Sequence, residues 1–261
     1  MVAGGATARA VQFIQPFWER QQSGLVYVRS RREATAQAEF FRERGWRCAP
    51  YHAGLAAPER RRLEADWVAG RLPFVVTTNA FGMGINKPDC RWVLHGQPPL
   101  TLADYSQEVG RGGRDGQPAT ALLLVSEPTG LLDPSDRQMR QFFQRSQADL
   151  VAKAAAIAPK LPRTGQAEAI AQEFPDGAIA LGLLHSFGHL IWRTPFEYEL
   201  QGENWRFPPP DSTPLAEMQD FIDTRQCRWA FLIAAFGFPE EGRHTRCGVC
   251  DRCRQRGVPG P

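Results

Sequence analysis

The stretch with the clearest chemical potential places two arginines three residues apart in a glycine-rich turn, Gln107-Glu108-Val109-Gly110-Arg111-Gly112-Gly113-Arg114-Asp115-Gly116. Phosphoryl transfer spreads negative charge over the γ-phosphate oxygens, and arginines held at that point stabilise the charge. A lone pair of arginines among glycines is more simply explained as a solvated surface turn. Gln107 before the pair and Asp115-Gly116 after it favour nucleotide chemistry instead.

A second loop leaves a predicted central strand as Thr77-Thr78-Asn79-Ala80-Phe81-Gly82-Met83-Gly84-Ile85-Asn86-Lys87-Pro88. Hydroxyls and glycine amides at a strand end can hold phosphate oxygens closely, because no Cβ blocks the approach. We therefore expect Gly82, Met83 and Gly84 to contribute to ATP binding, together with Arg111 and Arg114.

Two shorter strings, Tyr51-His52-Ala53-Gly54-Leu55 and Tyr27-Val28-Arg29-Ser30-Arg31-Arg32, also follow predicted strands. Each is weak alone, because His52 could be an ordinary capping or hydrogen-bonded histidine and the arginines could be a solvated helix start. Their value lies in occurring with the other two loops, each where a strand ends and a ligand would bind.

The six cysteines divide unevenly along the chain. Cys48 and Cys90 stand apart and are expected to be small buried side chains, whereas the other four fall within the last 35 residues: Cys227, Cys247, Cys250 and Cys253. Such a cluster in a cytoplasmic chain argues for metal rather than disulfides, and four thiolates can close a tetrahedral structural zinc site. His244 as a substitute ligand and an iron–sulfur cluster are the alternatives.

The elements that must position these loops follow from the apolar pattern. Short apolar runs alternate with amphipathic stretches from Gly24 onward, which is typical of a parallel sheet with crossover helices. The predicted strands cover residues 25–28, 49–51, 74–78, 92–95 and 120–125. Predicted helices begin at a Ser30/Glu33 capping box, at Pro58 and at Leu102. The fold class is therefore α/β, a doubly wound parallel sheet over residues 20–148.

The chain changes character after residue 148. A linker helix and a winged-helix-like segment are predicted over 149–210, because two short helices precede strand-like runs at 190–192 and 196–200. The run Pro208-Pro209-Pro210 separates this segment from a zinc-binding module at 211–256. Residues 1–19 are expected to be a lead-in and residues 257–261 a tail.

Composition bounds the class of protein. The chain has 261 residues, 43% of them hydrophobic, which suffices for one α/β core with small satellites. No stretch approaches the roughly 18 apolar residues that span a bilayer, and no secretion signal precedes the fold, so we expect a cytoplasmic protein without a membrane partner. The net charge is +3, and only three basic side chains are lysine. Arginine suits phosphate recognition, but a GC-rich genome gives the same bias.

Taken in order, the loops resemble the second motor lobe of superfamily 2 helicases and, in detail, the RecQ family of DNA helicases. The strings A-F-G-M-G-I-N-K-P and Q-E-x-G-R-x-G-R-D-G carry the resemblance, which covers residues 20–125 and returns at the cysteines. It implies a RecA-like lobe that shares ATP with another lobe and moves 3′ to 5′ along single-stranded and partly duplex DNA, associated with a bacterial nucleoid. One departure is Gly112, where the family usually has alanine.

The resemblance also assigns residues. Arg114 looks like the arginine finger, with Arg111 and Gln107 as its companions in catalysis. The residues similar to those that contact the DNA backbone, or couple it to the nucleotide, are Arg29, His52 and Thr78. The helix that opens the RecQ zinc domain would bury Trp229, Leu232 and Phe236. Six arginines would give the module a basic face toward DNA or, alternatively, a solvated rim: Arg225, Arg228, Arg243, Arg246, Arg252 and Arg254.

The other half of the ATP machinery has no counterpart in the sequence. None of the three lysines is followed by serine or threonine, as a Walker A loop requires, and there is no Asp-Glu-x-His string. We therefore expect ATP and Mg²⁺ to be shared with a missing first lobe, which a separate chain could supply in trans. We expect the chain alone to hydrolyse little ATP. The competing hypothesis is a zinc-containing DNA-binding accessory or remnant protein with no motor activity.

Overall fold

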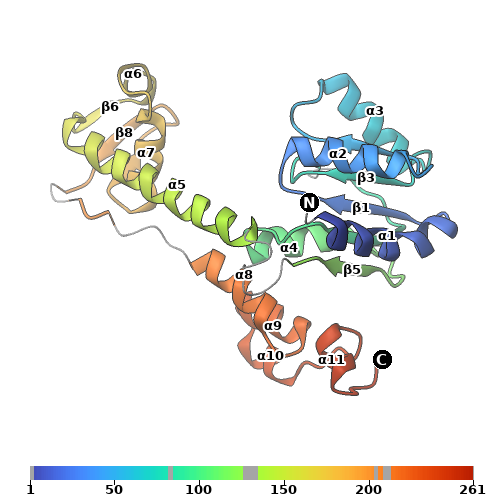
Figure 1. Cartoon of the computed structure of the whole chain (residues 1–261). Helices are drawn as coiled ribbons and strands as arrows, with labels where there is room; N and C mark the ends of the chain where they lie inside the picture. Colours follow the sequence, from blue (N-terminus) through green and yellow to red (C-terminus); the bar gives the residue numbers. More distant parts are fainter. Residues whose placement is uncertain (1–2, 82–84, 126–134, 203–204, 208–212, 261) are drawn as a thin grey trace. The chain divides into compact units, whose positions relative to one another are not determined.

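The computed structural model describes residues 3–81, 85–125, 135–202, 205–207 and 213–260. The chain forms two compact units (Figure 1). The first unit contains residues 1–136 and 214–261, and the second contains residues 137–213. Among the described residues, no helix is long and apolar enough to cross a membrane.

A five-stranded parallel sheet forms the centre of the first unit. Its strands are β1 (Ser23–Tyr27), β2 (Cys48–Tyr51), β3 (Phe74–Thr77), β4 (Cys90–His95) and β5 (Thr120–Leu123). Their order is β2-β3-β1-β4-β5, and all neighbouring pairs are parallel. The predicted doubly wound sheet is therefore confirmed.

Helices cover both faces of this sheet. On one face, α2 (Arg31–Arg42) begins at the predicted Ser30/Glu33 capping box and buries Ala34, Ala38 and Phe41 against the strands. On the other face, α3 (Ala57–Val68) buries Leu63 and Trp67. The helix α4 (Leu102–Val109) begins at Thr101, whose side chain accepts a hydrogen bond from the Asp104 N–H.

The segment predicted as a lead-in contains helix α1 (Ala3–Glu19), which packs with α2 on the sheet. Ala10 and Ile14 are buried, and Phe17 packs against the same core. Their helical spacing places them on one face, although Pro16 lies within the last turn. Helix α1 thus contributes to the core of the first unit.

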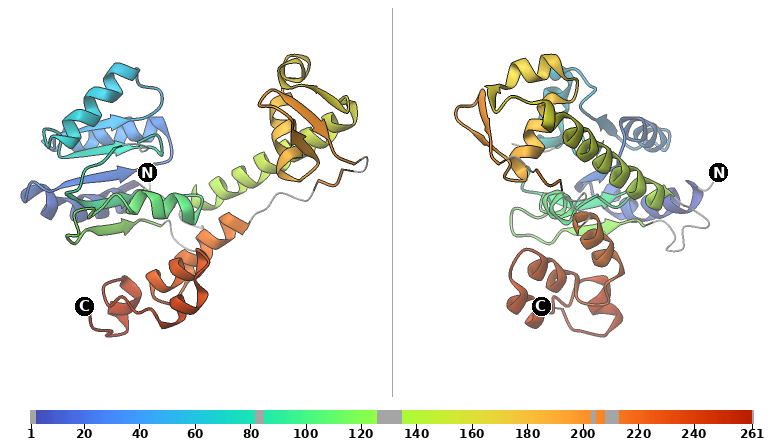
Figure 2. Two further views of the ribbon diagram at one scale, coloured as in Figure 1. Left: turned by 180° about the vertical axis from the view of Figure 1, so that it is seen from behind. Right: turned by 90° about the vertical axis from the view of Figure 1, so that its left-hand side faces the viewer.

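The second unit contains most of α5 (Ser135–Ile157), followed by the 3₁₀ turn η1 (Ala158–Lys160) and by β6 (Thr164–Gln166), α6 (Ala167–Glu173), α7 (Gly177–Ser186), β7 (Leu190–Trp192) and β8 (Glu197–Leu200). The strands form an antiparallel sheet in the order β6-β8-β7. The two predicted helices and hairpin are confirmed, and β6 is an additional strand. Leu161, Ile170, Leu184 and Tyr198 form the core of this unit. Figure 2 shows the short helices and strands of this unit gathered at the end of α5.

The cysteine module, residues 214–260, returns to the first unit. Its helices are α8 (Thr213–Asp223), α9 (Arg228–Ala235), α10 (Pro239–His244) and α11 (Asp251–Gln255). Met218, Phe221 and Leu232 form one buried cluster with Leu102 of α4. The module is therefore packed against the helix that precedes the arginine-containing turn.

Candidate functional site

The carboxyl ends of the parallel strands bring the predicted loops to one edge of the sheet. Arg29 follows β1, His52 follows β2 and Thr78 follows β3. Arg29 is held internally: its Nη2 and Nε donate to the Pro98 carbonyl at 2.7 and 3.1 Å, and Nη2 lies 3.0 Å from Asp136 Oδ1. The side chain joins the end of β1 to the loop after β4 and to the start of α5, so it has a structural role. Its contact with DNA stays a prediction.

Thr78 and His52 lie close to the strand ends. Thr78 is buried, its N–H donates to the Tyr51 carbonyl at 3.3 Å, and its hydroxyl accepts from the Ala80 N–H at 3.4 Å. His52 is half-buried, with Nε2 3.5 Å from the Thr35 hydroxyl. These contacts fix the chain where β2 and β3 end. The predicted DNA contacts of both residues remain predictions.

Arg114 joins the two glycine-containing loops. Its Nη1 donates to the Ile85 carbonyl and to Asn86 Oδ1, each at 3.4 Å, and its Nε donates to the Gly110 carbonyl at 3.2 Å. These bonds are long, and the side chain is exposed. Arg114 can therefore exchange them for a stronger bond to a phosphate oxygen. Gly82, Met83 and Gly84, predicted to bind ATP, lie outside the described residues.

Arg111 differs from Arg114 in its surroundings. Its side chain is buried, with 7% of the residue exposed, and it lies close enough to the Tyr27 hydroxyl to interact with it. Burial raises the pKa of Tyr27 well above its usual value, and the charge of Arg111 opposes this effect. The Tyr27 hydroxyl thus stays protonated beside the guanidinium. Gln107, the third predicted catalytic residue, is exposed on α4.

A buried pair next to Arg111, His95 and Glu108, was not predicted from the sequence. The N–H at Nε2 of His95 donates to Glu108 Oε2 at 2.8 Å, since a carboxylate can only accept. The His95 ring stacks on Tyr27 at 5.3 Å between centroids. Tyr27 and His95 are partners in the register of β1 and β4 and end both strands. The register comes from the fold, and the sequence shows only that each of these rings lies at the end of an apolar run.

Glycine lets the arginine turn fold back on itself. Gly113 has φ +66°, and a Cβ at this position would lie 2.5 Å from the Gln117 carbonyl oxygen. A Cβ at Gly112, where the resembling family usually carries alanine, would lie 3.0 Å from Ala119 Cβ. The turn is therefore tightly packed at Gly112. Next to it, Arg91 pairs with Asp115 and holds the pKa of that carboxyl below its usual value.

Lys87 has a structural role rather than a role at a phosphate. The residue is buried, and its ammonium group donates to the Val68 carbonyl at the end of α3, at 3.2 Å, while lying 3.1 Å from Asp89 Oδ1. A cation at a helix C-terminus is favoured by the helix dipole. Lys87 thus ties the loop after β3 to α3.

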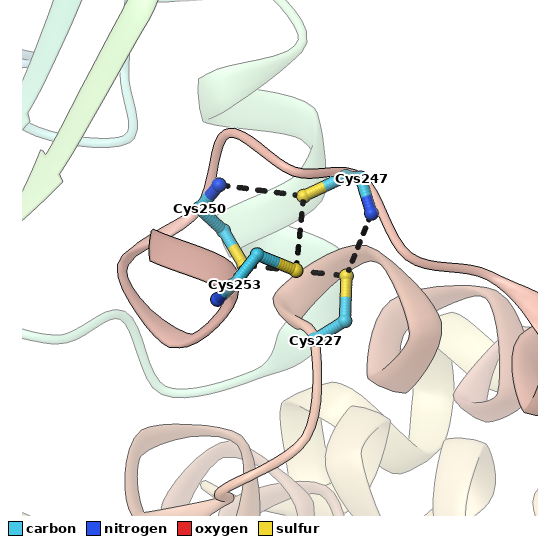
Figure 3. Close-up of side chains that lie close together, drawn as sticks. All are labelled: Cys227, Cys247, Cys250 and Cys253. Carbon is cyan, nitrogen blue, oxygen red and sulfur yellow. Dashed lines mark hydrogen bonds between the residues drawn. The ribbon is translucent and has the colours of Figure 1, made fainter. Parts of the chain in front are cut away.

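The four predicted cysteines come together in the cysteine module (Figure 3). Cys227 precedes α9, Cys247 and Cys250 lie in the loop before α11, and Cys253 lies on α11. All four sulfur atoms lie within 4.8 Å of one another, and two of the separations are 4.0 Å. Among the described residues, this is the one group of metal-ligand type, and His244 is not part of it.

The sulfur positions suit a tetrahedral ion. Zn–S bonds of about 2.3 Å in a regular tetrahedron separate the sulfurs by roughly 3.8 Å, close to the observed spacing. Backbone N–H groups also point at the sulfurs, from Cys247 to Cys227 at 3.4 Å and from Cys250 to Cys247 at 3.3 Å. Although burial acts to raise it, the combined hydrogen bonds lower the pKa of Cys227 to about 6. The group can hold a metal ion.

The surroundings of the cysteines correct two predictions. Leu232 is buried as predicted, but Trp229 is 55% exposed and Phe236 is 46% exposed. One face of α9 packs against α8, and the short helix lies at the surface, so its other face remains in solvent. The prediction that Trp229 and Phe236 belong to the core is therefore wrong.

The six arginines of the module are not equivalent. Arg228 donates to both oxygens of Asp251 at 2.9 Å, and Arg252 lies 3.6 Å from the same carboxylate. Arg243 pairs with Glu240 at 2.9 Å. Arg246 donates to the carbonyls of Arg243 and Thr245. Arg225 and Arg254 are exposed. A basic face toward DNA therefore stays a prediction.

Comparison with known proteins gives consistent matches. Residues 8–116 match the family described as helicase conserved C-terminal domain. The ATP-dependent DNA helicase RecQ of Synechocystis is 44% identical over 235 residues, which is 89% of this chain and 49% of that protein. The RecQ helicase of Haemophilus influenzae is 42% identical over 133 residues, 48% of this chain and 21% of that protein.

The chain spans about half the length of the Synechocystis relative. Because that match covers 89% of the chain, it extends into both compact units. Among solved structures, the E. coli DEAD-box protein SrmB, bound to a regulator of ribonuclease activity, is 24% identical with a TM-score of 0.43, covering 51% of this chain and 78% of that chain.

Proposed function

Because this chain belongs to the RecQ family of DNA helicases, as the C-terminal lobe of the motor, we propose that it completes an ATP site and moves 3′ to 5′ along single-stranded DNA. In this role it acts on ATP and Mg²⁺ presented by a first lobe, in the same protein or in trans. The proposed DNA substrate is single-stranded or partly duplex, and the proposed location is the bacterial cytoplasm at the nucleoid.

The observation that carries the proposal is the placement of Arg114. It is exposed and bridges the turn after α4 to Ile85 and Asn86 of the loop after β3. A γ-phosphate arriving from another lobe would meet its guanidinium without opening the core. An arginine supplied in this way is worth roughly 10³-fold or more in the rate of phosphoryl transfer.

The metal we propose for the four cysteines is zinc, with a structural role. Four thiolates leave no coordination position for a substrate, so a bound zinc ion would hold the loop before α11 to the start of α9. The chemistry of ATP hydrolysis would be carried by other residues. Exposed Arg225 and Arg254 of the same module are proposed to contact DNA phosphates, together with Arg29, His52 and Thr78.

The decisive experiment supplies a first lobe carrying a Walker A loop, fused to or mixed with this chain, and measures ATP hydrolysis with and without single-stranded DNA. We expect DNA-stimulated hydrolysis, and a loss on the order of 10³-fold on Arg114→Ala. The matched control is Arg71→Ala, which removes an exposed arginine paired with Asp66 at 2.7 Å. It should leave the rate unchanged.

Two outcomes would contradict the proposal. Equal hydrolysis by the wild type and by Arg114→Ala would show that Arg114 is not the finger. No hydrolysis with any first lobe, combined with salt-sensitive DNA binding that is lost on chelation, would favour the non-motor DNA-binding protein instead.

A further inference from the structure

A continuous row of packed side chains joins the cysteine module to the turn that carries Arg111, all within the first unit. The row begins at Arg228, the first residue of α9. Its backbone N–H donates to Cys250 Sγ at 3.5 Å, and its guanidinium donates to Asp251 at 2.9 Å. The loop that holds the cysteines therefore also fixes the position of Arg228.

The next step connects Arg228 to α4. Its guanidinium lies 5.1 Å from the ring centroid of Phe221 and donates to the carbonyls of Phe221 and Ile222. Phe221 is 2% exposed, and its ring centroid lies 4.9 Å from that of Tyr105 on α4. Leu102, one turn earlier on α4, packs in the same cluster. One face of α4 is thus buried by the cysteine module.

Tyr105 also packs against the residues that end strands β1 and β4. Its ring centroid lies 5.3 Å from the His95 ring, and the Tyr27 ring stacks on His95 at the same distance with an interplanar angle of 16°. His95 donates to Glu108 at 2.8 Å, and the Tyr27 hydroxyl lies beside Arg111. Glu108 also accepts a backbone hydrogen bond from the Arg111 N–H at 3.3 Å.

We propose that Tyr105 is a positioning residue through which the cysteine module holds the His95–Glu108 pair, and with it Arg111, in place. Tyr105 is half-buried, and the rings of Phe221, His95 and Tyr27 beside it are buried. Rings packed in such close contact cannot shift independently, because protein interiors are packed as densely as organic crystals. Arg111 is itself buried, so its guanidinium takes its direction from these neighbours. The consequence for ATP rests on the proposed function, whereas the link from Tyr105 to Arg111 does not.

The link is tested on the complete zinc-loaded chain by NMR of the arginine Nε–Hε groups, with the Arg111 signal assigned by Arg111→Lys. Tyr105→Leu should shift or broaden that signal, and Phe221→Leu should affect it in the same direction. Tyr105→Phe keeps the ring and should restore the wild-type position. The control Phe41→Leu removes a ring as deeply buried as that of Phe221 on the opposite face of the sheet and should leave the signal unchanged.

The consequence for catalysis is tested after a first lobe is supplied. Tyr105→Leu should lower kcat for DNA-stimulated ATP hydrolysis on the order of tenfold with little change in KM for ATP, and Tyr105→Phe should restore kcat. An Arg111 signal unmoved by both Tyr105→Leu and Phe221→Leu would overturn the positioning role. If the wild type hydrolyses no ATP with a first lobe, the proposed function fails, while the NMR result still decides the link.

Discussion

Arg111 and Arg114 have the same side chain in one turn, yet they occupy opposite environments. Arg114 is exposed and makes three long hydrogen bonds to loop acceptors, whereas Arg111 is buried beside Tyr27. An exposed arginine can reorganise when a ligand arrives, but a buried one depends on the packing around it. Substitutions in the surrounding core should therefore disturb Arg111 more than Arg114.

The turn itself should be sensitive at one glycine more than at another. Gly113 and Gly116 both have positive φ, of +66° and +80°, but only Gly113 lacks room for a Cβ, which would lie 2.5 Å from the Gln117 carbonyl. Gly116→Ala should lower the free energy of unfolding by about 1–2 kcal/mol, the cost of the left-handed backbone alone. Gly113→Ala should cost clearly more, as measured by urea unfolding. Equal losses would show that the crowding at Gly113 is relieved without strain.

Tyr105 predicts a dependence of stability on alkaline pH. Burial raises the pKa of Tyr105 to about 12 in the folded protein, whereas the unfolded residue titrates near 10. Between pH 10 and pH 12, the folded state therefore keeps a proton that the unfolded state has lost. The contribution of the protonated Tyr105 hydroxyl to the free energy of unfolding is complete below pH 10 and is lost as the pH rises. When the pH is raised from 9 to 11, the free energy of unfolding should fall by about 1 kcal/mol less in Tyr105→Phe than in the wild type, as measured by urea unfolding at each pH. Parallel stability curves would contradict the raised pKa.

At the scale of elements, two residues of α9 that the sequence predicts to be buried differ in their exposure to solvent. Leu232 faces α4 and α8 and is 8% exposed, whereas Trp229 is 55% exposed. Leu232→Ala should therefore lower the free energy of unfolding by about 2–4 kcal/mol, and Trp229→Ala by less than about 1 kcal/mol. Chemical denaturation of the zinc-loaded chain measures both. A larger loss for Trp229→Ala would place the indole in the core after all.

Much of the fold could be predicted because the apolar pattern determines it locally. The strand from Leu25, the capping box at Ser30 and the close spacing of Cys247, Cys250 and Cys253 each depend on near neighbours in sequence, and all are confirmed in the structure. Helix α1 was not predicted because no Ser, Thr, Asp or Asn precedes Ala3 in the sequence, although Ala10 and Ile14 have helical spacing.

The parts of the site that could not be predicted depend on contacts between distant segments. His95 meets Glu108 only because α4 folds back beneath the end of β4, and Arg29 meets Asp136 across more than a hundred residues. Arg111, in the turn after α4, is likewise buried and interacts with Tyr27 at the end of β1, far away in the sequence. Residue types and spacing were enough to identify the loops, but only the tertiary structure shows that Arg111 is buried and Arg114 is exposed.

At the scale of the whole molecule, the second unit has a core of its own, built around Leu161, Leu184 and Tyr198. The cysteine module shares buried residues with α4 and belongs to the first unit. A metal bound there would therefore contribute to the stability of the first unit rather than to that of the second unit, because its ligands lie in the loop that contacts Arg228, which packs on Phe221.

We expect this organisation to appear as two thermal transitions by calorimetry, only one of which depends on zinc. Removing zinc with a strong chelator, or replacing Cys250 by serine, should lower the first unit's transition by several degrees, because the module that covers α4 becomes disordered. The second unit's transition should not move, and Leu184→Ala should lower that transition alone. Ligand thiols must lose protons to bind the metal, so the zinc-dependent difference should shrink as pH falls below neutrality. Chelation that leaves both transitions in place would show that the cysteines do not stabilise the lobe.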